Sequence, residues 1–509
     1  MCGFVVGTAS ARSDLPDTRT GIDSLTHRGP DEQGSWDHPE EGVRFSQCRL
    51  SVIDPPGGTQ PMTRNGHALV FNGELYNYRK LRTRLKSSGH SFRTDSDTEV
   101  FLQGYREWGT DLFDRVRGMF AAVIWDEAKE RTVLVRDHVG QKPLFYHQGP
   151  DQFVAGSEIQ GLLSATDRIN RRVDPASLSW YLSLGYVPAP RSGFFSVKKL
   201  QPGHYMIVEG TDIRDQVRYW DPVDVSRKSP IEEDPEGAVR ETVRKAVRRR
   251  LVSDVPLGAF LSGGLDSSVI VAVMADELDS QVTTVSVGFE DDTYDERDHA
   301  RTVADRHGTD HHSFNLGLSL EEVLPRLVRH FGEPFADSSA VPTYYLAEQT
   351  RNLVKVTLSG DGGDEVFGGY RRYRALRYWS YLNAVLPGFL RKGIGSLARQ
   401  LPDPSDRRSR SGEVLRLLRM SGKSAVEQYL ELVGLGEDNR KEELARGPLR
   451  KPARRGGEQW LQRWFRRFDH VRDPAQQAMF VDLMSYLPGD LLVKTDITTM
   501  MNSLECRSP

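Results

Sequence analysis

Short apolar runs separated by turn residues dominate the first 220 positions of the chain. The runs GFVVG (3–7), HALVFNGELYN (67–77) and FAAVIWD (120–126) are rich in β-branched and aromatic residues, so they predict strands. Two stretches with helical periodicity lie among them, at 78–89 and 97–109. Strands and helices mixed in this way predict a layered domain in which sheets are sandwiched between helices.

Strand and helix patterns alternate in the second half of the chain. Apolar strand patterns at 257–262, 282–289 and 354–360 are separated by helical patterns. This alternation predicts a parallel α/β sheet, which binds its ligands at the carboxyl ends of the strands. From Tyr373 onward the pattern is almost wholly helical.

A polar, proline-rich stretch at 221–235 predicts a linker between the two patterns. We therefore expect an α/β protein with one domain over 1–220 and a second over 236–509. A long helix, to about 251, should open the second domain.

Composition and charge exclude several classes of protein. Of the 509 residues, 38% are hydrophobic and 27% are charged, as in globular proteins. The formal net charge of −3 argues against a nucleic-acid partner, and the basic cluster RKAVRRR (244–250) has the spacing of a solvated helix face. No apolar run approaches the ~20 residues of a membrane span, and no signal-peptide pattern opens the chain. We expect a cytoplasmic protein without a membrane partner.

The three cysteines, Cys2, Cys48 and Cys506, follow no pairing pattern and indicate neither a disulfide framework nor a zinc site. Cys48 precedes Arg49 in a predicted strand and is interpreted as a core residue. Cys2 has two interpretations, a small buried hydrophobe or a nucleophile. If Met1 is removed, the free α-amino group of Cys2, with a pKa of ~7.7 to 8.0, can take the proton of the thiol.

The segment FLSGGLDSS (260–268) has the pattern of a phosphate-binding loop. Gly263 and Gly264 allow a tight turn with inward N–H groups, and the N-terminus of the following helix adds positive potential. Asp266 would repel phosphate unless a cation such as Mg²⁺ lay between them. The lysine of a Walker A motif is missing, which excludes that class of ATPase.

A second loop of the same kind occurs in LSGDGGDEVFGGYRRY (358–373). Ser359 and Gly360 allow close approach of the backbone to a ligand, while Asp361, Asp364 and Glu365 offer carboxylates for a second metal position. Either loop alone could be a plain glycine turn. Because both follow strands of one α/β unit, we expect a shared nucleotide site.

Four segments of the first half resemble the markers of class II glutamine amidotransferases, which are N-terminal-nucleophile enzymes with an αββα fold. The segments are HRGPD (27–31), RLSVID (49–54), FNGELYNY (71–78) and SDTEV (96–100). In the second half, SGGLDSS resembles the pyrophosphate loop of the N-type ATP pyrophosphatases. Together with SGDGGDEVFGGY it is similar to the synthetase domain of glutamine-hydrolysing asparagine synthetases.

The resemblance implies roles for residues of the first domain. Cys2 attacks the glutamine amide, and the Asn72 side chain with the Gly73 N–H forms the oxyanion hole. Arg49 binds the α-carboxylate, while Asp97 and the Glu74 region take the α-ammonium. His27 is left as structural. The glutamine-binding residues implied in this way are Arg49, Leu50, Ser51, Val52, Ile53, Asn72, Gly73, Glu74 and Asp97.

The resemblance also implies an ATP site that holds Mg²⁺-pyrophosphate on Asp266 and Asp364. Asp361 occupies the position of an acidic residue tied to formation of the acyl-adenylate. The implied ATP-binding residues are Phe260, Leu261, Ser262, Gly263, Gly264, Asp266, Ser267, Ser268, Val287, Ser359 and Gly360.

The implied reaction makes asparagine from aspartate, with glutamine as the nitrogen donor and ATP converted to AMP and pyrophosphate. Homodimers are common in the family, so a homodimer is compatible with the resemblance. The segment PFADSSA (334–340), where the acceptor should bind, carries no arginine for an aspartate carboxylate. Transfer to another carboxylate, of a modified sugar or a peptide, therefore stays an alternative.

The carboxyl-terminal segment LLVKTDITTMMNSLECRSP (491–509) is similar to the family's K-x-D-[RK]…SLE-x-R-x-P segment. Relatives continue to a Lys-x-x-Leu-Arg stretch whose lysine stabilises charge during adenylation. Ile497 replaces a residue that is usually basic, and Cys506 one that is usually small and aliphatic. We therefore expect a second domain truncated at its C-terminus. A protein that retains only glutaminase activity or ligand binding is a further alternative.

Overall fold

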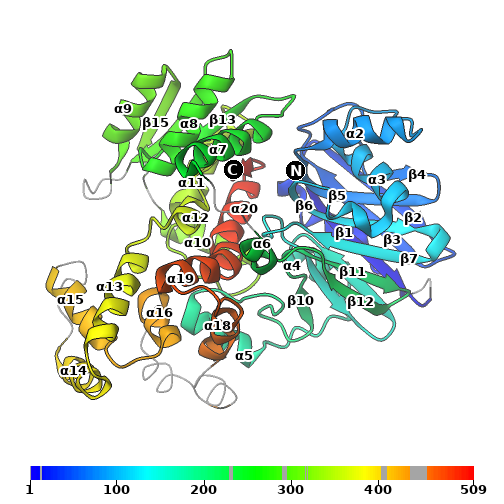
Figure 1. Ribbon diagram of the computed structural model, residues 1–509. Coiled ribbons are helices and arrows are strands. Elements are labelled where there is room, and N and C mark those ends of the chain that lie inside the picture. Colours follow the sequence, from blue (N-terminus) through cyan, green and yellow to red (C-terminus); the bar gives the residue numbers. More distant parts are fainter. Residues whose placement is uncertain are drawn as a thin grey trace.

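The computed structural model describes residues 2–11, 14–228, 233–288, 295–315, 317, 319–402, 410–435, 447 and 456–509. Within these residues, no helix is both long enough and apolar enough to cross a membrane. Figure 1 shows the sheets of the first half on one side and the α/β and helical parts on the other.

Two six-stranded antiparallel sheets form the first half of the chain. Across the first sheet the strands are β10 (Val197–Lys199), β8 (Phe145–Gln148), β9 (Gln152–Gly156), β1 (Cys2–Ala9), β3 (Val43–Arg49) and β2 (Glu32–His38). Across the second they are β12 (Asp212–Arg218), β11 (His204–Glu209), β7 (Arg131–Arg136), β6 (Gly118–Asp126), β5 (His67–Leu75) and β4 (Met62–Arg64).

The main core of this half lies between the two sheets. Phe4 of β1 shares one apolar cluster with Val70 of β5 and Val123 of β6. The neighbouring residue Val5 points to the other face of β1, where it packs with Leu162 of α4. Both faces of β1 are therefore buried, and its sequence is apolar without alternation.

Helices cover the outer faces of both sheets. The first sheet is covered by α1 (Thr18–Asp23) and α4 (Ile159–Ala165), and the second by α2 (Tyr78–Ser87) and α3 (Asp97–Trp108). Three 3₁₀ turns connect these elements: η2 (Thr26–Arg28), η3 (Gly109–Leu112) and η4 (Glu127–Lys129). The predicted αββα arrangement is confirmed.

A five-stranded parallel sheet organises the second half. Its strands, in order, are β15 (Asp310–Asn315), β14 (Thr283–Gly288), β13 (Leu257–Phe260), β16 (Val356–Leu358) and β17 (Glu505–Arg507). Around it lie α7 (Pro235–Arg250), α8 (Leu265–Glu277), α9 (Arg297–His307), α10 (Leu320–Phe331), α11 (Ala340–Arg351) and α20 (Leu492–Met500). The predicted parallel α/β sheet is confirmed, although the sequence patterns indicate neither β15 nor β17.

The remaining helices form a bundle beside the sheet (Figure 1). They are α12 (Gly363–Phe367), α13 (Arg371–Val385), α14 (Gly388–Gln400), α15 (Arg410–Arg419), α16 (Ala425–Val433), α18 (Gly456–Arg467), α19 (Pro474–Met484) and the π-helical turn η8 (Leu487–Leu491). Helix α5 (Pro175–Leu184) of the first half packs against α16 and α18.

The region expected to be a linker contains a short helix, α6 (Pro222–Lys228). Its first turn is capped by Asp221, whose Oδ1 accepts the Val223 N–H at 3.1 Å. Val223 is buried in the helical bundle with Tyr373 and Trp460. Positions 229–232 of the expected linker lie outside the described residues.

Candidate active sites

Cys2 stands at the start of β1, opposite Arg49 of β3. Its backbone N–H donates to Asn72 Oδ1 of the second sheet at 3.1 Å. The Asn72 Nδ2 is buried and has no hydrogen-bond partner in the described part of the chain. A buried amide donor without a partner, beside a thiol, suits an oxyanion that develops during amide hydrolysis.

The surroundings of Cys2 keep its thiol protonated. Burial raises its pKa above the ordinary value, although the Arg49 charge and hydrogen bonds from Gln47 and the Leu50 backbone act in the opposite direction. A neutral thiol is a weak nucleophile, so a base has to remove its proton. Burial raises the pKa of Cys48 to about 12, and its S–H donates to the Leu25 carbonyl at 3.1 Å. Cys48 is a core residue, as predicted.

Gly73 allows β5 and β6 to approach closely beside Asn72. Its φ is +154°, and a Cβ built there would lie 2.0 Å from the Met119 carbonyl oxygen. A larger residue would push β5 away from β6 and displace Asn72 with it. The close approach of β5 to β6 therefore requires a glycine at this position, which is the one predicted for the oxyanion hole.

Buried carboxylates gather at the next positions of the site. Burial raises the pKa of Asp97 to about 6. It also raises the pKa of Glu74 well above the usual range, and the charges of Glu505 and Asp97 add to that shift. Asp97 Oδ2 accepts the Leu75 N–H at 2.8 Å, which fixes the carboxylate in place. A bound cation would favour the charged forms of these groups, as an α-ammonium subsite requires.

The guanidinium of Arg49 is held by the loop that follows it. Its Nη1 donates to the Pro55 carbonyl at 2.8 Å and to Glu32 at 3.2 Å. Its Nη2 donates to the carbonyls of Ile53 and Asp54. Binding of a glutamine carboxylate by both terminal nitrogens would have to displace some of these bonds, so the role expected of Arg49 stays a prediction.

The segment 50–53 also contacts the second half of the chain. The Ser51 N–H donates to Asp31 Oδ2 at 2.9 Å, and Asp31 forms an ion pair with Lys355. The Val52 carbonyl accepts the Asp254 N–H at 3.1 Å. The predicted glutamine-binding segment therefore lies against the residues that precede β13 and β16.

The two glycine-rich loops meet at the carboxyl edge of the parallel sheet. They follow the neighbouring strands β13 and β16, so the chain brings them side by side. A Cβ on Gly360 would lie 3.1 Å from the Asp266 Cβ, and one on Gly363 would lie 2.5 Å from its Cγ. Val287 lies near the same edge, at the end of β14. The two predicted nucleotide loops therefore lie side by side, as the topology requires.

Hydroxyl and N–H groups line the first of these loops. The Gly264 N–H donates to Ser262 Oγ at 3.2 Å, and Ser268 Oγ donates to the Gly264 carbonyl at 2.7 Å. Gly263 has a φ of +81°, and a Cβ there would lie 2.5 Å from the backbone nitrogen of Ala300. Ser267 Oγ lies 3.1 Å from Ser262 Oγ. The loop has the compact, donor-rich form that anionic ligands require.

Asp266 and Asp364 lie in the first turns of the helices α8 and α12, which follow the two loops. Burial raises the pKa of Asp266 above its ordinary value, and the charge of Asp364 raises it further. Burial also raises the pKa of Asp364. A divalent cation between the two carboxylates would relieve this repulsion, so the pair fits a Mg²⁺ site.

Asp361 belongs to a charged cluster that the sequence indicates only in part. Its Oδ2 accepts hydrogen bonds from Ser359 Oγ at 2.9 Å and from Thr495 Oγ1 at 2.8 Å. Lys494 lies in the same cluster, where its Nζ is 3.0 Å from Ser339 Oγ and 3.5 Å from Asp337 Oδ2. Burial lowers the Lys494 pKa, but nearby carboxylates, Asp361 first, outweigh it and leave the pKa raised.

Asp490 completes this cluster from the turn η8. Burial raises its pKa to about 8, and the charge of Asp337 adds to the shift. Its Oδ1 is buried without a hydrogen-bond partner among the described residues. The K-x-D segment is the only sequence signal for Lys494, and it does not show that this residue returns to the loop of Asp361; no sequence signal indicates Asp490.

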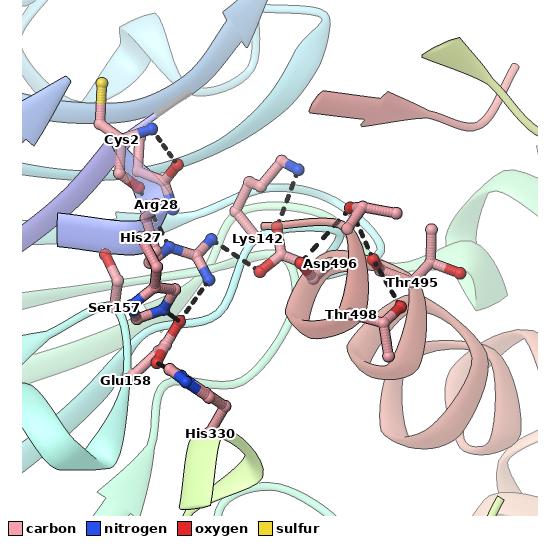
Figure 2. Close-up of polar contacts among 12 residues, drawn as sticks. Cys2, His27, Arg28, Lys142, Ser157, Glu158, His330, Thr495, Asp496 and Thr498 are labelled. Carbon is pink, nitrogen blue, oxygen red and sulfur yellow. Dashed lines mark hydrogen bonds and ion pairs between the residues drawn. The ribbon is translucent and has the colours of Figure 1, made fainter. Parts of the chain in front are cut away.

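Arg28 joins the two halves of the molecule (Figure 2). This fully buried side chain donates from Nη1 to Glu158 Oε1 and from Nη2 to Asp496 Oδ2, each at 2.7 Å. Lys142 Nζ donates to the other oxygen of Asp496 at 2.9 Å. Two cations and two carboxylates thus balance their charges at a buried contact between domains.

Two successive residues of α20 contact the two candidate sites. Thr495 bonds to Asp361, as described above. Asp496 bonds to Arg28, whose Nε donates to the Cys2 carbonyl at 3.3 Å. A displacement of α20 would therefore alter the surroundings of Asp361 and Cys2 together.

Comparisons with known proteins identify the family of the chain. Residues 1–220 match the family model of the glutamine amidotransferase domain, and residues 238–509 match that of asparagine synthase. The chain is 34% identical to asparagine synthetase [glutamine-hydrolyzing] 1 of Bacillus subtilis, over 100% of this chain and 79% of that protein. The chain belongs to the glutamine-hydrolysing asparagine synthetase family. As a member, it is an ATP-dependent ligase that takes glutamine as its amido donor.

The chain is also similar to two further proteins. A putative asparagine synthetase [glutamine-hydrolyzing] of Mycobacterium tuberculosis is 34% identical, over 100% of this chain and 80% of that protein. Amidase chry2 of Gibberella zeae is 31% identical, over 72% of this chain and 57% of that protein.

Proposed function

We propose that Cys2 is the nucleophile that releases ammonia from glutamine and that residues 1–220 form the glutaminase domain. The observation that carries this proposal is the unpaired, buried Nδ2 of Asn72 beside Cys2. After removal of Met1, the α-amino group of Cys2 takes the thiol proton, and the sulfur attacks the amide carbon. The Asn72 Nδ2 and the Gly73 N–H then donate to the oxyanion.

The ends of the glutamine substrate are held by different parts of the site. Asp97 and Glu74 take the α-ammonium, because both are buried carboxylates whose charged forms need a cation nearby. Arg49, with the segment 50–53, takes the α-carboxylate. The thioester formed at Cys2 is hydrolysed by water, which leaves glutamate.

We assign ATP binding to the two loops of residues 236–509. The N–H groups and hydroxyls of 262–268 face the pyrophosphate portion, while Phe260, Leu261 and Val287 line the adenosine. Asp266 and Asp364 would hold Mg²⁺. When bound, this ion neutralises charge on the phosphate oxygens.

The acceptor proposed is aspartate. Its side-chain carboxylate attacks the α-phosphorus of ATP and pyrophosphate leaves; ammonia then displaces AMP from the adenylate and asparagine forms. Beside Asp361 lie Lys494, Asp337 and Asp490. This cluster offers an ammonium group and carboxyl groups to the charged groups of an amino-acid acceptor. Lys494 screens the negative charge that gathers during adenylation.

A product assay with glutamine, aspartate, ATP and Mg²⁺ tests the whole proposal. Asparagine, glutamate, AMP and pyrophosphate should appear in equal amounts. Cys2→Ala should abolish glutamate release and leave synthesis from added ammonia intact, whereas the matched variant Cys48→Ala should keep both activities. Undiminished glutamate release by Cys2→Ala would contradict the assignment of the nucleophile.

The identity of the acceptor is tested separately by ATP–pyrophosphate exchange with a panel of carboxylic acids. Exchange that depends on aspartate supports the proposal. Exchange with a sugar or peptide acid, and none with aspartate, would assign the chain to transfer onto another carboxylate, while leaving the glutaminase intact.

A further inference from the structure

Three metal-ligating side chains meet where the two domains touch, outside both candidate active sites. They are His27 of η2, Glu158 directly before α4, and His330 in the last turn of α10 (Figure 2). One ligand atom from each lies within 4.8 Å of the others. No other such trio of His, Cys, Asp or Glu occurs in the part of the chain that the structure describes.

The spacing of these atoms is close to that of ligands around one ion. His27 Nε2 lies 3.1 Å from Glu158 Oε1, and His330 Nδ1 lies 3.8 Å from Glu158 Oε2. Ligands at ~2.0 to 2.1 Å from a tetrahedral Zn²⁺ are about 3.3 Å apart. Small side-chain rotations would therefore bring all three atoms to a common centre.

Glu158 has an oxygen available for this purpose. Its side chain is 1% exposed, and Oε1 already accepts from Arg28 and contacts His27. Oε2 is buried and has no hydrogen-bond partner among the residues described. Oε2 is therefore the oxygen of Glu158 that can contact a further cation.

The two imidazoles are accessible and suitably placed. Their side chains are 16% and 22% exposed, and their ring centroids are 4.3 Å apart. This partial exposure makes both imidazoles accessible from solvent. His330 also lies at the carboxyl end of α10, where the helix dipole favours positive charge.

We propose that His27, Glu158 and His330 form a binding site for a divalent transition-metal ion of the Zn²⁺ class. Two imidazole nitrogens and one carboxylate oxygen suit this class, whereas Mg²⁺ prefers oxygen ligands only. The ion would link the glutaminase domain, through His27 and Glu158, to α10 of the synthetase domain. It takes no part in the reaction and is independent of the Mg²⁺ assigned to Asp266 and Asp364.

Titration of the metal-free full chain with Co²⁺, in excess Mg²⁺, tests this site. Wild-type protein should bind one equivalent and develop the visible absorption of a four-coordinate Co²⁺ complex, and added Zn²⁺ should abolish this absorption. Zn²⁺ should also raise the thermal unfolding midpoint.

The matched variants are His330→Gln, which removes a ligand, and His312→Gln, which removes a histidine paired with Asp310 on the surface. His330→Gln should lose the absorption and the Zn²⁺-dependent rise in the midpoint, and His312→Gln should keep both. The midpoint without metal shows whether each variant is folded. Wild-type protein that binds no Co²⁺, or His330→Gln that binds it as wild type does, would overturn the proposal; the trio would then be an ordinary ion-pair cluster.

Discussion

Arg28 and Asp496 form an ion pair at 2.7 Å although they are 468 positions apart in the chain. Both side chains are buried, at 0% and 2% exposure, so water contributes little to their solvation. Asp496 therefore depends on Arg28 and Lys142 of the other domain for its partners, whereas Arg28 also pairs with Glu158 of its own domain.

Asp496→Asn should destabilise the protein strongly. The change leaves Arg28 and Lys142 buried with one carboxylate fewer, a loss that typically costs about 3 to 5 kcal/mol. Chemical denaturation monitored at the domain contact would measure it. Asp310→Asn is the matched control, because Asp310 forms an exposed pair with His312 that should contribute at most about 1 kcal/mol. Equal losses in the two variants would contradict the importance of the buried pair.

Asn72→Ala should slow glutamine hydrolysis without affecting synthesis from ammonia. Loss of one oxyanion donor typically lowers kcat by about 10²- to 10³-fold. Steady-state measurement of glutamate release gives the effect, and ammonia-dependent asparagine formation by the same variant is the internal control. A variant with unchanged glutaminase kcat would show that Nδ2 does not serve the oxyanion.

The glutaminase should depend on pH through Asp97. Its pKa is raised to about 6 in the folded chain, so the group is protonated below that pH and cannot pair with the α-ammonium. The kcat/KM for glutamine, which reports the free enzyme, should therefore rise as pH increases through about 6. Asp97→Asn should have low kcat/KM and lack this rise. An unchanged profile in that variant would assign the titration to another group.

Asp97 should also make the stability of the fold depend on pH. Stability should fall as pH rises, whereas glutaminase activity should increase. Its folded pKa lies above the ~3.9 of an unfolded aspartate, so its contribution favours the fold at low pH and is lost as pH rises from about 4 to 6. A pH series of unfolding free energies, compared between wild type and Asp97→Asn, isolates this contribution.

Lys494→Met should abolish adenylation while glutamine hydrolysis continues. The side chain is the cation among Asp337, Asp361 and Asp490, where substrate and phosphates add further negative charge. We expect ATP–pyrophosphate exchange to fall about 10²-fold or more. Lys245→Met, on the surface of α7, should have no effect. Exchange at the wild-type rate in Lys494→Met would remove this lysine from the mechanism.

Asp266→Asn should raise the Mg²⁺ concentration that gives half-maximal exchange. Changes around a metal typically lower its affinity by about 10- to 100-fold, and a direct ligand should reach at least this range. Asp276→Asn, an exposed change on the same helix, is the control. If both variants needed the same Mg²⁺ concentration as wild type, Asp266 would not be a ligand.

Much of the fold and of both candidate sites could be predicted from local patterns. Glycine-rich loops such as 262–264 carry their signal in a few consecutive residues, and β1 is apolar because both of its faces are buried. The helix α6 escaped prediction because its helical signals are short and its stability comes from packing of Val223 into the bundle. Strand β15 is polar and lies at the edge of its sheet, where apolar alternation is not required.

The charged contacts between domains could not be predicted for a different reason. Arg28 is part of a recognisable motif, but nothing near it in sequence indicates Asp496 or His330. Lys494 and Thr495 contact the loop of Asp361 only because η8 and α20 return the chain to the sheet. Contacts of this kind depend on tertiary folding and have no local pattern.

Strand β17 lies beside β16 in the parallel sheet, yet the entire helical bundle separates the two strands in sequence. Pairing of strands so distant in sequence requires loop closure before any contact forms and raises the contact order, which slows folding. The sheet next to the nucleotide loops should therefore be completed late, after the bundle has formed. Until then β16 is paired only with β13 and forms an open edge, which leaves this strand free to associate with another chain.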